Sequence, residues 1–223
     1  MNENEKDLET MRAVNLATQI YDGLKREGSG LPYITHSFGV FLIVRQYTSD
    51  VNVQVAGLFH DFFKKRIPKK GSTSGEIYTY DDLTHLVGIP AARLVDEISH
   101  YRDAGLQAPG DWRQAKYQAL AEFSQLSPGA KIIFVANQIH NLFSLVEDYK
   151  SHKTKVWEIF EASEEMMAVY YADIMQTVIG GFRHPMIEAY YHVFREACQL
   201  FGWNLIYDKG TKGLVWAKTL ADN

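Results

Sequence analysis

An adjacent histidine and aspartate stand inside an apolar stretch of the chain. Leu58-Phe59 precede His60-Asp61, and Phe62-Phe63 follow them. Burying a lone carboxylate among such side chains is costly unless a partner compensates its charge. A metal ion would accept the imidazole nitrogen and the carboxylate oxygen together. The alternative is a His-Asp pair that is solvated or bonded to the backbone.

A second histidine favours the metal interpretation. His36 precedes His60 by 24 residues, at the start of the preceding predicted helix. Two antiparallel helices joined by a short turn would bring both imidazoles to one level of a helical bundle. His36 is therefore a candidate third ligand, although a lone histidine at such a place more often belongs only to the helix start.

Polar side chains form a stripe on a later apolar segment, residues 132–145. They stand at positions i, i+3, i+4 and i+7, which places them on one helix face. Their identities are Asn137, His140, Asn141 and Ser144. The stripe either faces solvent or lines an internal site.

A basic run, residues 64–70, follows the His-Asp pair, and five of its seven residues are cationic. Cations favour a helix C-terminus and are usually solvated. The functional alternative is a phosphate-binding patch beside the metal, to which Lys25 and Arg26 would contribute. Nucleophilic catalysis is not indicated, because Cys198 lies among apolar residues and the chain has no G-x-S-x-G, P-loop or GxGxxG motif.

Helical periodicity over most of the chain has to position these residues. The predicted fold class is an all-α helical bundle with a small C-terminal β-hairpin. Helices are expected over about 7–25, 51–65, 81–86, 155–179 and 185–201. Three more are expected to begin near residues 35, 90 and 128, and the last of these includes residues 132–146. The hairpin is expected from 204–207 and 214–216 around the turn 208–213, with a flexible loop at 71–75.

The predicted helix 51–65 has a consequence for the two lysines after the His-Asp pair. Lys64 follows His60 by four residues, so both would share a helix face and Lys64 would point toward the metal pocket. Lys65 would lie about 100° further round the helix.

Composition limits the class of protein. The chain has 223 residues, 46% hydrophobic composition and a formal net charge of −4. We expect one domain, 1–203, with residues 204–223 as a hairpin appendage packed on it. A generally basic nucleic-acid binder is excluded, and a single cysteine excludes an intrachain disulfide framework. The acidic start lacks a targeting pattern and no apolar run is long enough to span a membrane, so a cytoplasmic protein is predicted.

Several segments together resemble one family. Residues 31–37 are similar to a PYxxHP segment, residues 55–61 to AALLHD, residues 92–98 to the helix that follows, and residues 127–141 to a helix with an LADRLHN-like pattern. This order resembles the HD-domain superfamily of metal-dependent phosphohydrolases, and most closely the hydrolase domain of RelA/SpoT proteins and small alarmone hydrolases. The resemblance spans roughly residues 12–200.

The resemblance implies an all-α fold, a divalent metal, commonly manganese in this family, and removal of the 3′-pyrophosphate from guanosine tetra- or pentaphosphate. By position, the implied metal ligands are His36, His60, Asp61 and Asn137. The implied substrate-binding residues are Lys25, Arg26 and Asn141. The expected partner is a small phosphorylated molecule such as a nucleotide, with no nucleic acid and no membrane.

The chain departs from the family pattern at its expected catalytic residues. Asn137 stands where the family has an aspartate ligand, so metal affinity should be lower. Lys64 and Lys65 stand where the family has Glu-Asp, and an ammonium cannot accept a hydrogen bond from the attacking water. It can bind a phosphate, and Asp61 is then the carboxylate nearest the water.

Two functions follow from these residues. In one, the chain is a phosphohydrolase with Asp61, Lys64 and Lys65 as catalytic residues. In the other, it is a catalytically inactive module that binds a nucleotide or phosphate at a degenerate HD site.

Overall fold

The computed structural model describes residues 3–26, 29–70, 75–103, 117, 120–158, 163–208 and 213–216. The chain divides into two compact units, which are described separately. The first comprises Met1–Arg26 and Gly30–Ala136, and the second comprises Glu27–Ser29 and Asn137–Asn223. The predicted boundary between 203 and 204 stays a prediction.

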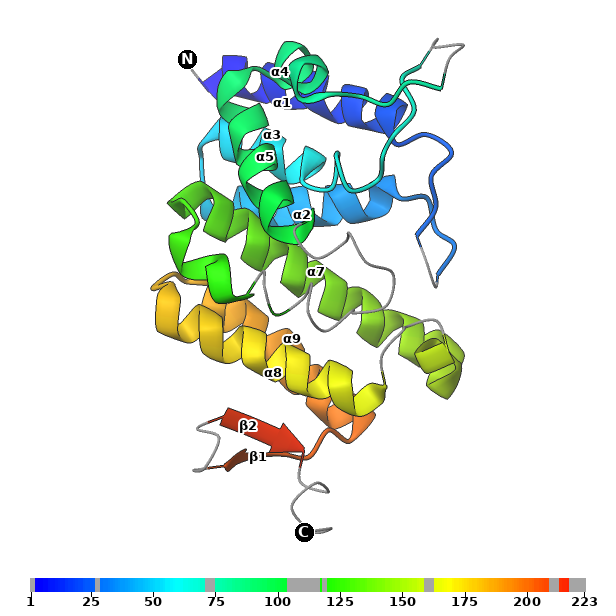
Figure 1. Ribbon diagram of the computed structural model, residues 1–223, viewed down its shortest axis with the longest axis vertical. Helices are drawn as coiled ribbons and strands as arrows, with labels where there is room; N and C mark the ends of the chain where they lie inside the picture. Colours follow the sequence, from blue (N-terminus) through cyan, green and yellow to red (C-terminus); the bar gives the residue numbers. More distant parts are fainter. Residues whose placement is uncertain are drawn as a thin grey trace. The chain divides into compact units, whose positions relative to one another are not determined.

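Helices make up the first unit, as the periodicity predicts (Figure 1). Their bounds are α1 Glu3–Ile20, α2 Ile34–Tyr47, α3 Val51–Phe59, α4 Tyr80–Val87, α5 Ile89–Asp103 and the short 3-10 helix η1 Phe123–Gln125. The central element is α3, which contacts α1, α2 and α5 and is buried at every residue except Asn52. Gly57 allows this close packing, because a Cβ there would lie 3.2 Å from Cγ2 of Val44.

The helix α3 ends earlier than the sequence predicts. It stops at Phe59 rather than near residue 65, and residues 60–66 form turns. The chain turns because Phe62 and Ile67 are both buried, at 1% and 4% exposure, and Arg66 adopts a left-handed φ of 45°.

The connection between α1 and α2 is also a turn where the sequence predicts helix. The predicted helix 7–25 is instead Glu3–Ile20, and Gly23 adopts a φ of 80°. Backbone hydrogen bonds close this turn, from Arg26 N to Leu31 O and from Tyr33 N to Leu24 O, both at 2.8 Å. They place Tyr33 directly before the first turn of α2.

Local sequence signals set the remaining helix ends of the first unit. Thr79 and Asp82 form a reciprocal capping box at α4, which Gly88 ends with a φ of 81°. At the start of the next long helix, α7 Pro128–His152, Glu97 accepts hydrogen bonds from the Ser127 amide at 2.6 Å and the Ser127 hydroxyl at 2.8 Å. The predicted start at Ser127-Pro128 is therefore confirmed.

The second unit contains the rest of α7 and the C-terminal elements. These are η2 Lys153–Glu158, α8 Glu164–Gly181, α9 Met186–Phe201, β1 Leu205–Asp208 and β2 Gly213–Trp216. The strands pair antiparallel, Leu205 opposite Trp216, and β2 lies against α8. The all-α fold with a C-terminal hairpin is confirmed. Most of the predicted loop 71–75 and of the turn 208–213 lies outside the described residues.

Within the described part of the chain, no helix combines the length and apolarity needed to cross a bilayer.

Candidate metal centre

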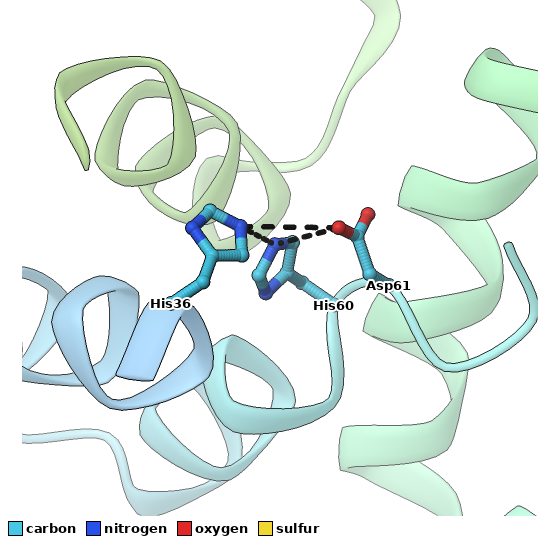
Figure 2. A group of neighbouring side chains, drawn as sticks. All are labelled: His36, His60 and Asp61. Carbon is cyan, nitrogen blue, oxygen red and sulfur yellow. Dashed lines mark hydrogen bonds and ion pairs between the residues drawn. The ribbon is translucent and has the colours of Figure 1, made fainter. Parts of the chain in front are cut away.

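Three side chains from two elements converge in the first unit. His36 stands in the first turn of α2, whereas His60 caps the C-terminus of α3 and Asp61 begins the turn after it. Their imidazole rings and carboxylate point toward one another (Figure 2). All three residues are buried, with exposures of 2%, 1% and 5%.

The distances within this cluster suit a shared ion. The Nε2 atoms of His36 and His60 lie 3.0 Å apart. Oδ2 of Asp61 lies 3.8 Å from Nε2 of His36 and 3.5 Å from Nε2 of His60. Two ligand atoms on one ion can be separated by at most about 4.4 Å, because metal–ligand bonds are roughly 2.0–2.2 Å. The His-His-Asp group therefore could hold a metal.

A backbone carbonyl orients His60 for this role. Nδ1 of His60 lies 2.9 Å from the carbonyl oxygen of Gly57. Because the carbonyl only accepts, Nδ1 carries the proton and Nε2 of the neutral ring keeps its lone pair. This arrangement is the usual one for a metal-ligating histidine, whose other ring nitrogen donates to the protein.

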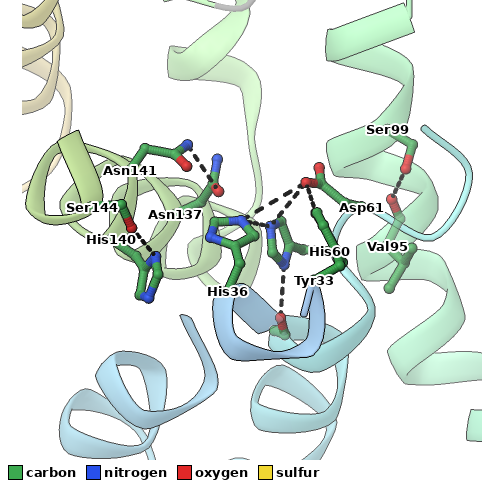
Figure 3. A network of polar contacts seen from close by, with 11 residues as sticks. Tyr33, His36, His60, Asp61, Val95, Ser99, Asn137, His140, Asn141 and Ser144 are labelled. Carbon is green, nitrogen blue, oxygen red and sulfur yellow. Dashed lines mark hydrogen bonds and ion pairs between the residues drawn. The ribbon is translucent and has the colours of Figure 1, made fainter. Parts of the chain in front are cut away.

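Tyr33 holds the carboxylate, a contact that the sequence analysis missed. Its hydroxyl donates a hydrogen bond to Oδ2 of Asp61 (Figure 3). The only signal for this role in the sequence is the place of Tyr33 three residues before His36, one helical turn away. Nearby, burial raises the pKa of Tyr21, and the charge of Asp61 raises it further.

Lysine placement differs from the prediction. The ammonium of Lys65 lies over the ring of Tyr33, 4.6 Å from its centroid, whereas Lys64 is exposed. The expectation that Lys64 shares a helix face with His60 and points into the pocket is wrong, because α3 ends at Phe59. Catalytic roles for either lysine remain predictions.

The match to a family model covers most of the chain. Residues 13–171 match the model described as the HD domain. The chain belongs to the HD-domain family. This range includes the whole His36, His60 and Asp61 cluster.

Known relatives of this HD domain agree with that assignment. The human guanosine-3′,5′-bis(diphosphate) 3′-pyrophosphohydrolase MESH1 is 26% identical over 176 residues, which cover 77% of this chain and 84% of MESH1. The solved structure of a metazoan orthologue of SpoT that hydrolyses ppGpp has a TM-score of 0.61 at 20% identity, covering 87% of this chain and 96% of that one. The structure of lmo0812 from Listeria monocytogenes EGD-e has a TM-score of 0.55 at 20% identity, covering 75% and 99%. These structures share the fold.

The last two lysines in the basic run of this HD domain lie beside carboxylates. Lys69 forms an ion pair with Asp82 at 2.6 Å, and Lys70 lies 3.8 Å from Asp22. The Lys69 ammonium and the Thr79 amide and hydroxyl lower the pKa of Asp82 to about 2. These two lysines therefore fit the solvated, structural alternative better than a phosphate patch.

The other predicted substrate-binding cations lie in the turn before α2. Lys25 is exposed and Arg26 is half-buried. Their contact with a nucleotide stays a prediction. Cys198 behaves as expected for a non-nucleophilic residue, since burial raises the pKa of its thiol to about 11.

The polar stripe lies on α7 in the second unit. Asn141 donates a hydrogen bond to Oδ1 of Asn137 at 3.2 Å, and Ser144 lies 3.2 Å from Nδ1 of His140 (Figure 3). Asn137 is buried and Asn141 is half-buried. A ligand role for Asn137 and a nucleoside contact for Asn141 stay predictions.

Proposed function

We propose that this HD domain is a phosphohydrolase that requires a divalent metal and acts on a nucleotide or another small phosphorylated molecule. The observation that carries the proposal is the buried convergence of His36, His60 and Asp61. Buried charges in proteins are paired or coordinate metals, and this donor set of two imidazoles and one carboxylate suits a divalent transition metal.

His36, His60 and Asp61 would hold the ion, for which we propose Mn²⁺. When bound, such an ion lowers the pKa of a bound water and polarises a phosphoryl oxygen. The protein's own part is positional: Gly57 fixes the tautomer of His60, and burial of the cluster removes competing solvent. As the predicted fourth ligand, Asn137 would add an amide oxygen without charge, so metal retention should be weak.

The proposed substrate is guanosine tetraphosphate, with loss of its 3′-pyrophosphate. The sequence likeness to human MESH1, whose name states this activity, supports the choice. Lys25, Arg26 and Asn141 are proposed to bind the nucleotide. Lys65 is half-buried beside the ring of Tyr33, where its charge could neutralise a substrate phosphate.

The same lysine favours the second candidate function, a binding module without turnover. Lys65 lies next to the group that holds Asp61, at a position where the resembled family has a carboxylate. An ammonium can retain a phosphate but cannot accept a proton from water. A nucleotide would then bind and remain intact.

The test is an incubation of the purified chain with Mn²⁺ and a panel of nucleotides that includes guanosine tetraphosphate, followed by measurement of released phosphate and pyrophosphate. We expect metal-dependent release that His60→Ala abolishes and that His192→Ala, at an exposed histidine on α9, leaves intact. Nucleotide binding without release would favour the binding module. Release that persists in His60→Ala would contradict the proposed site.

A further inference from the structure

We propose that Tyr33 is a positioning residue that fixes the carboxylate of Asp61 in its metal-binding orientation. The inference rests on the proposed function, because it assigns a residue to the same metal site. It assigns Tyr33 a role toward the metal ligand Asp61 rather than toward the ion itself.

One carboxylate oxygen carries the argument. Oδ2 of Asp61 accepts the hydrogen bond from the Tyr33 hydroxyl. The same Oδ2 faces both imidazoles, at 3.8 Å from His36 and 3.5 Å from His60. A carboxylate oxygen has two lone-pair directions, so one can accept from Tyr33 while the other points at the ion.

The position of Asp61 in the chain explains why it needs such a partner. It lies in a turn after the end of α3, outside the regular hydrogen bonding of the helix. The helix therefore does not set the orientation of its carboxylate, and restricting side-chain torsions to a ligand geometry costs entropy. A hydrogen bond from a fixed donor lowers that cost before the metal binds.

Tyr33 is a fixed donor. It is 3% exposed, and its backbone amide donates to the carbonyl of Leu24. Its ring contacts the ring of Tyr21, with centroids 5.3 Å apart, and the ring of His36, with centroids 5.6 Å apart. These contacts restrict the ring, and therefore the place from which its hydroxyl donates.

Lys65 completes this support from the face of the ring. Its ammonium lies 4.6 Å from the Tyr33 centroid, within the usual range of a cation–π contact. The backbone amide of Lys65 donates to the carbonyl of Asp61 at 3.2 Å. The turn from Asp61 to Lys65 therefore carries both the metal ligand and the cation that lies over the ring of Tyr33, the hydrogen-bond donor to that ligand.

The test compares Mn²⁺ binding to wild type and Tyr33→Phe by calorimetric titration. This substitution keeps the ring and removes only the hydroxyl. We expect Mn²⁺ affinity to fall by about 10–100-fold, the usual effect of removing a group that orients a metal ligand. Equal affinity in the two proteins would overturn the proposal.

Tyr21→Phe is the matched control. The Tyr21 hydroxyl is also buried, on the neighbouring ring, and in the part of the chain that the structure describes no hydrogen bond joins it to His36, His60 or Asp61. Its removal should leave Mn²⁺ affinity within about twofold, because it holds no ligand. An equal loss in both variants would indicate general loosening of the core and would count against the proposal.

A second background separates positioning from a purely structural role. Asp61→Ala retains the two histidines, so its binding can be followed with Ni²⁺, which binds imidazole more tightly than Mn²⁺. Adding Tyr33→Phe to Asp61→Ala should leave Ni²⁺ affinity unchanged, since the oxygen that accepts from Tyr33 is already gone. A further loss of Ni²⁺ affinity would contradict action through Asp61.

Replacing Tyr33 by 4-aminophenylalanine restores an N–H donor at the same end of the ring. It should recover most of the Mn²⁺ affinity, and it supplies the test if Tyr33→Phe does not fold. If the folded 4-aminophenylalanine variant bound Mn²⁺ no better than Tyr33→Phe, the proposal would be overturned. If Tyr33→Phe does not fold, a 4-aminophenylalanine variant whose Mn²⁺ affinity is not near that of wild type would overturn it instead. Wild-type Mn²⁺ binding without hydrolysis of any nucleotide would instead count against the proposed function alone.

Discussion

The histidine-aspartate cluster and the polar stripe on α7 are built in opposite ways. In the cluster, His36 from α2 and His60 and Asp61 from the end of α3 bring their polar atoms together across 24 residues of sequence. In the stripe, the Asn141–Asn137 and Ser144–His140 hydrogen bonds join residues four apart on one helix. The stripe therefore pairs polar side chains along a single helix, whereas the cluster concentrates three metal-binding atoms in a buried space. This difference is why we assign the metal to the cluster.

The largest expected effect comes from removing one histidine in each region. His36→Ala should lower Mn²⁺ affinity by more than about 100-fold, because loss of a direct ligand exceeds loss of a supporting group. His140→Ala should change it much less, because the structure shows His140 bonded within its own helix. Calorimetric titration of both variants measures the contrast. Equal losses would show that the stripe takes as large a part in metal binding as the cluster.

Substitution of Asn137 tests whether the polar stripe on α7 contributes a ligand to the metal centre. Asn137→Asp should raise Mn²⁺ affinity by about tenfold if the predicted fourth ligand is correct, because a carboxylate adds charge to an oxygen ligand. Asn141→Asp is the matched control on the same helix and should have a smaller effect. An Asn137→Asp variant with wild-type affinity would remove Asn137 from the ligand set.

The two lysines after the cluster should differ in their effect. Lys65→Asp is expected to increase hydrolysis of guanosine tetraphosphate, because it replaces a group that cannot accept a hydrogen bond from water with one that can. Lys64→Glu, at an exposed side chain, should have little effect. The difference is measured by the rates at which both single variants and the double variant hydrolyse guanosine tetraphosphate. A larger gain from Lys64→Glu would contradict the placement of Lys65 over Tyr33.

The smallest effect concerns the paired end of the basic run. In the folded chain the pKa of Asp82 is about 2, below its ordinary value of 3.8. A lowered folded pKa contributes stability that is present above pH 3.8 and is lost as the pH falls through 2. The Tm difference between wild type and Asp82→Asn should therefore shrink from pH 5 to pH 2. A constant difference across this range would show that the Lys69–Asp82 pair does not set the pKa.

Sequence reasoning reached the helical fold and the cluster because both depend on local or regular patterns. Helical periodicity and the Ser127-Pro128 start were sufficient for most elements. His36 and His60 could be paired because two short helices with a tight turn allow few arrangements. The likeness to HD-domain motifs then ordered these residues into one site.

The missed features depend on tertiary packing. The sequence does not show that α3 ends at Phe59 and that Phe62 and Ile67 are buried after it, so the helix-face argument directed Lys64 to the pocket, whereas the structure leaves Lys64 exposed. The Tyr33 contact with Asp61 joins residues 28 apart and follows no helical spacing. Ion pairs of Lys69 and Lys70 likewise required the position of α4 and of the turn after α1.

The central claim is that His36 and His60 bind one divalent ion. Pulsed electron paramagnetic resonance of the Mn²⁺-loaded chain tests it directly, because nitrogen nuclei bound to Mn²⁺ modulate the electron spin echo. We expect couplings from two imidazole nitrogens in wild type and from one in His36→Ala. In the His36→Ala, His60→Ala double variant, any Mn²⁺ that still binds elsewhere on the chain should show no nitrogen coupling. A wild-type spectrum without nitrogen coupling, or one that both substitutions leave unchanged, would contradict the account.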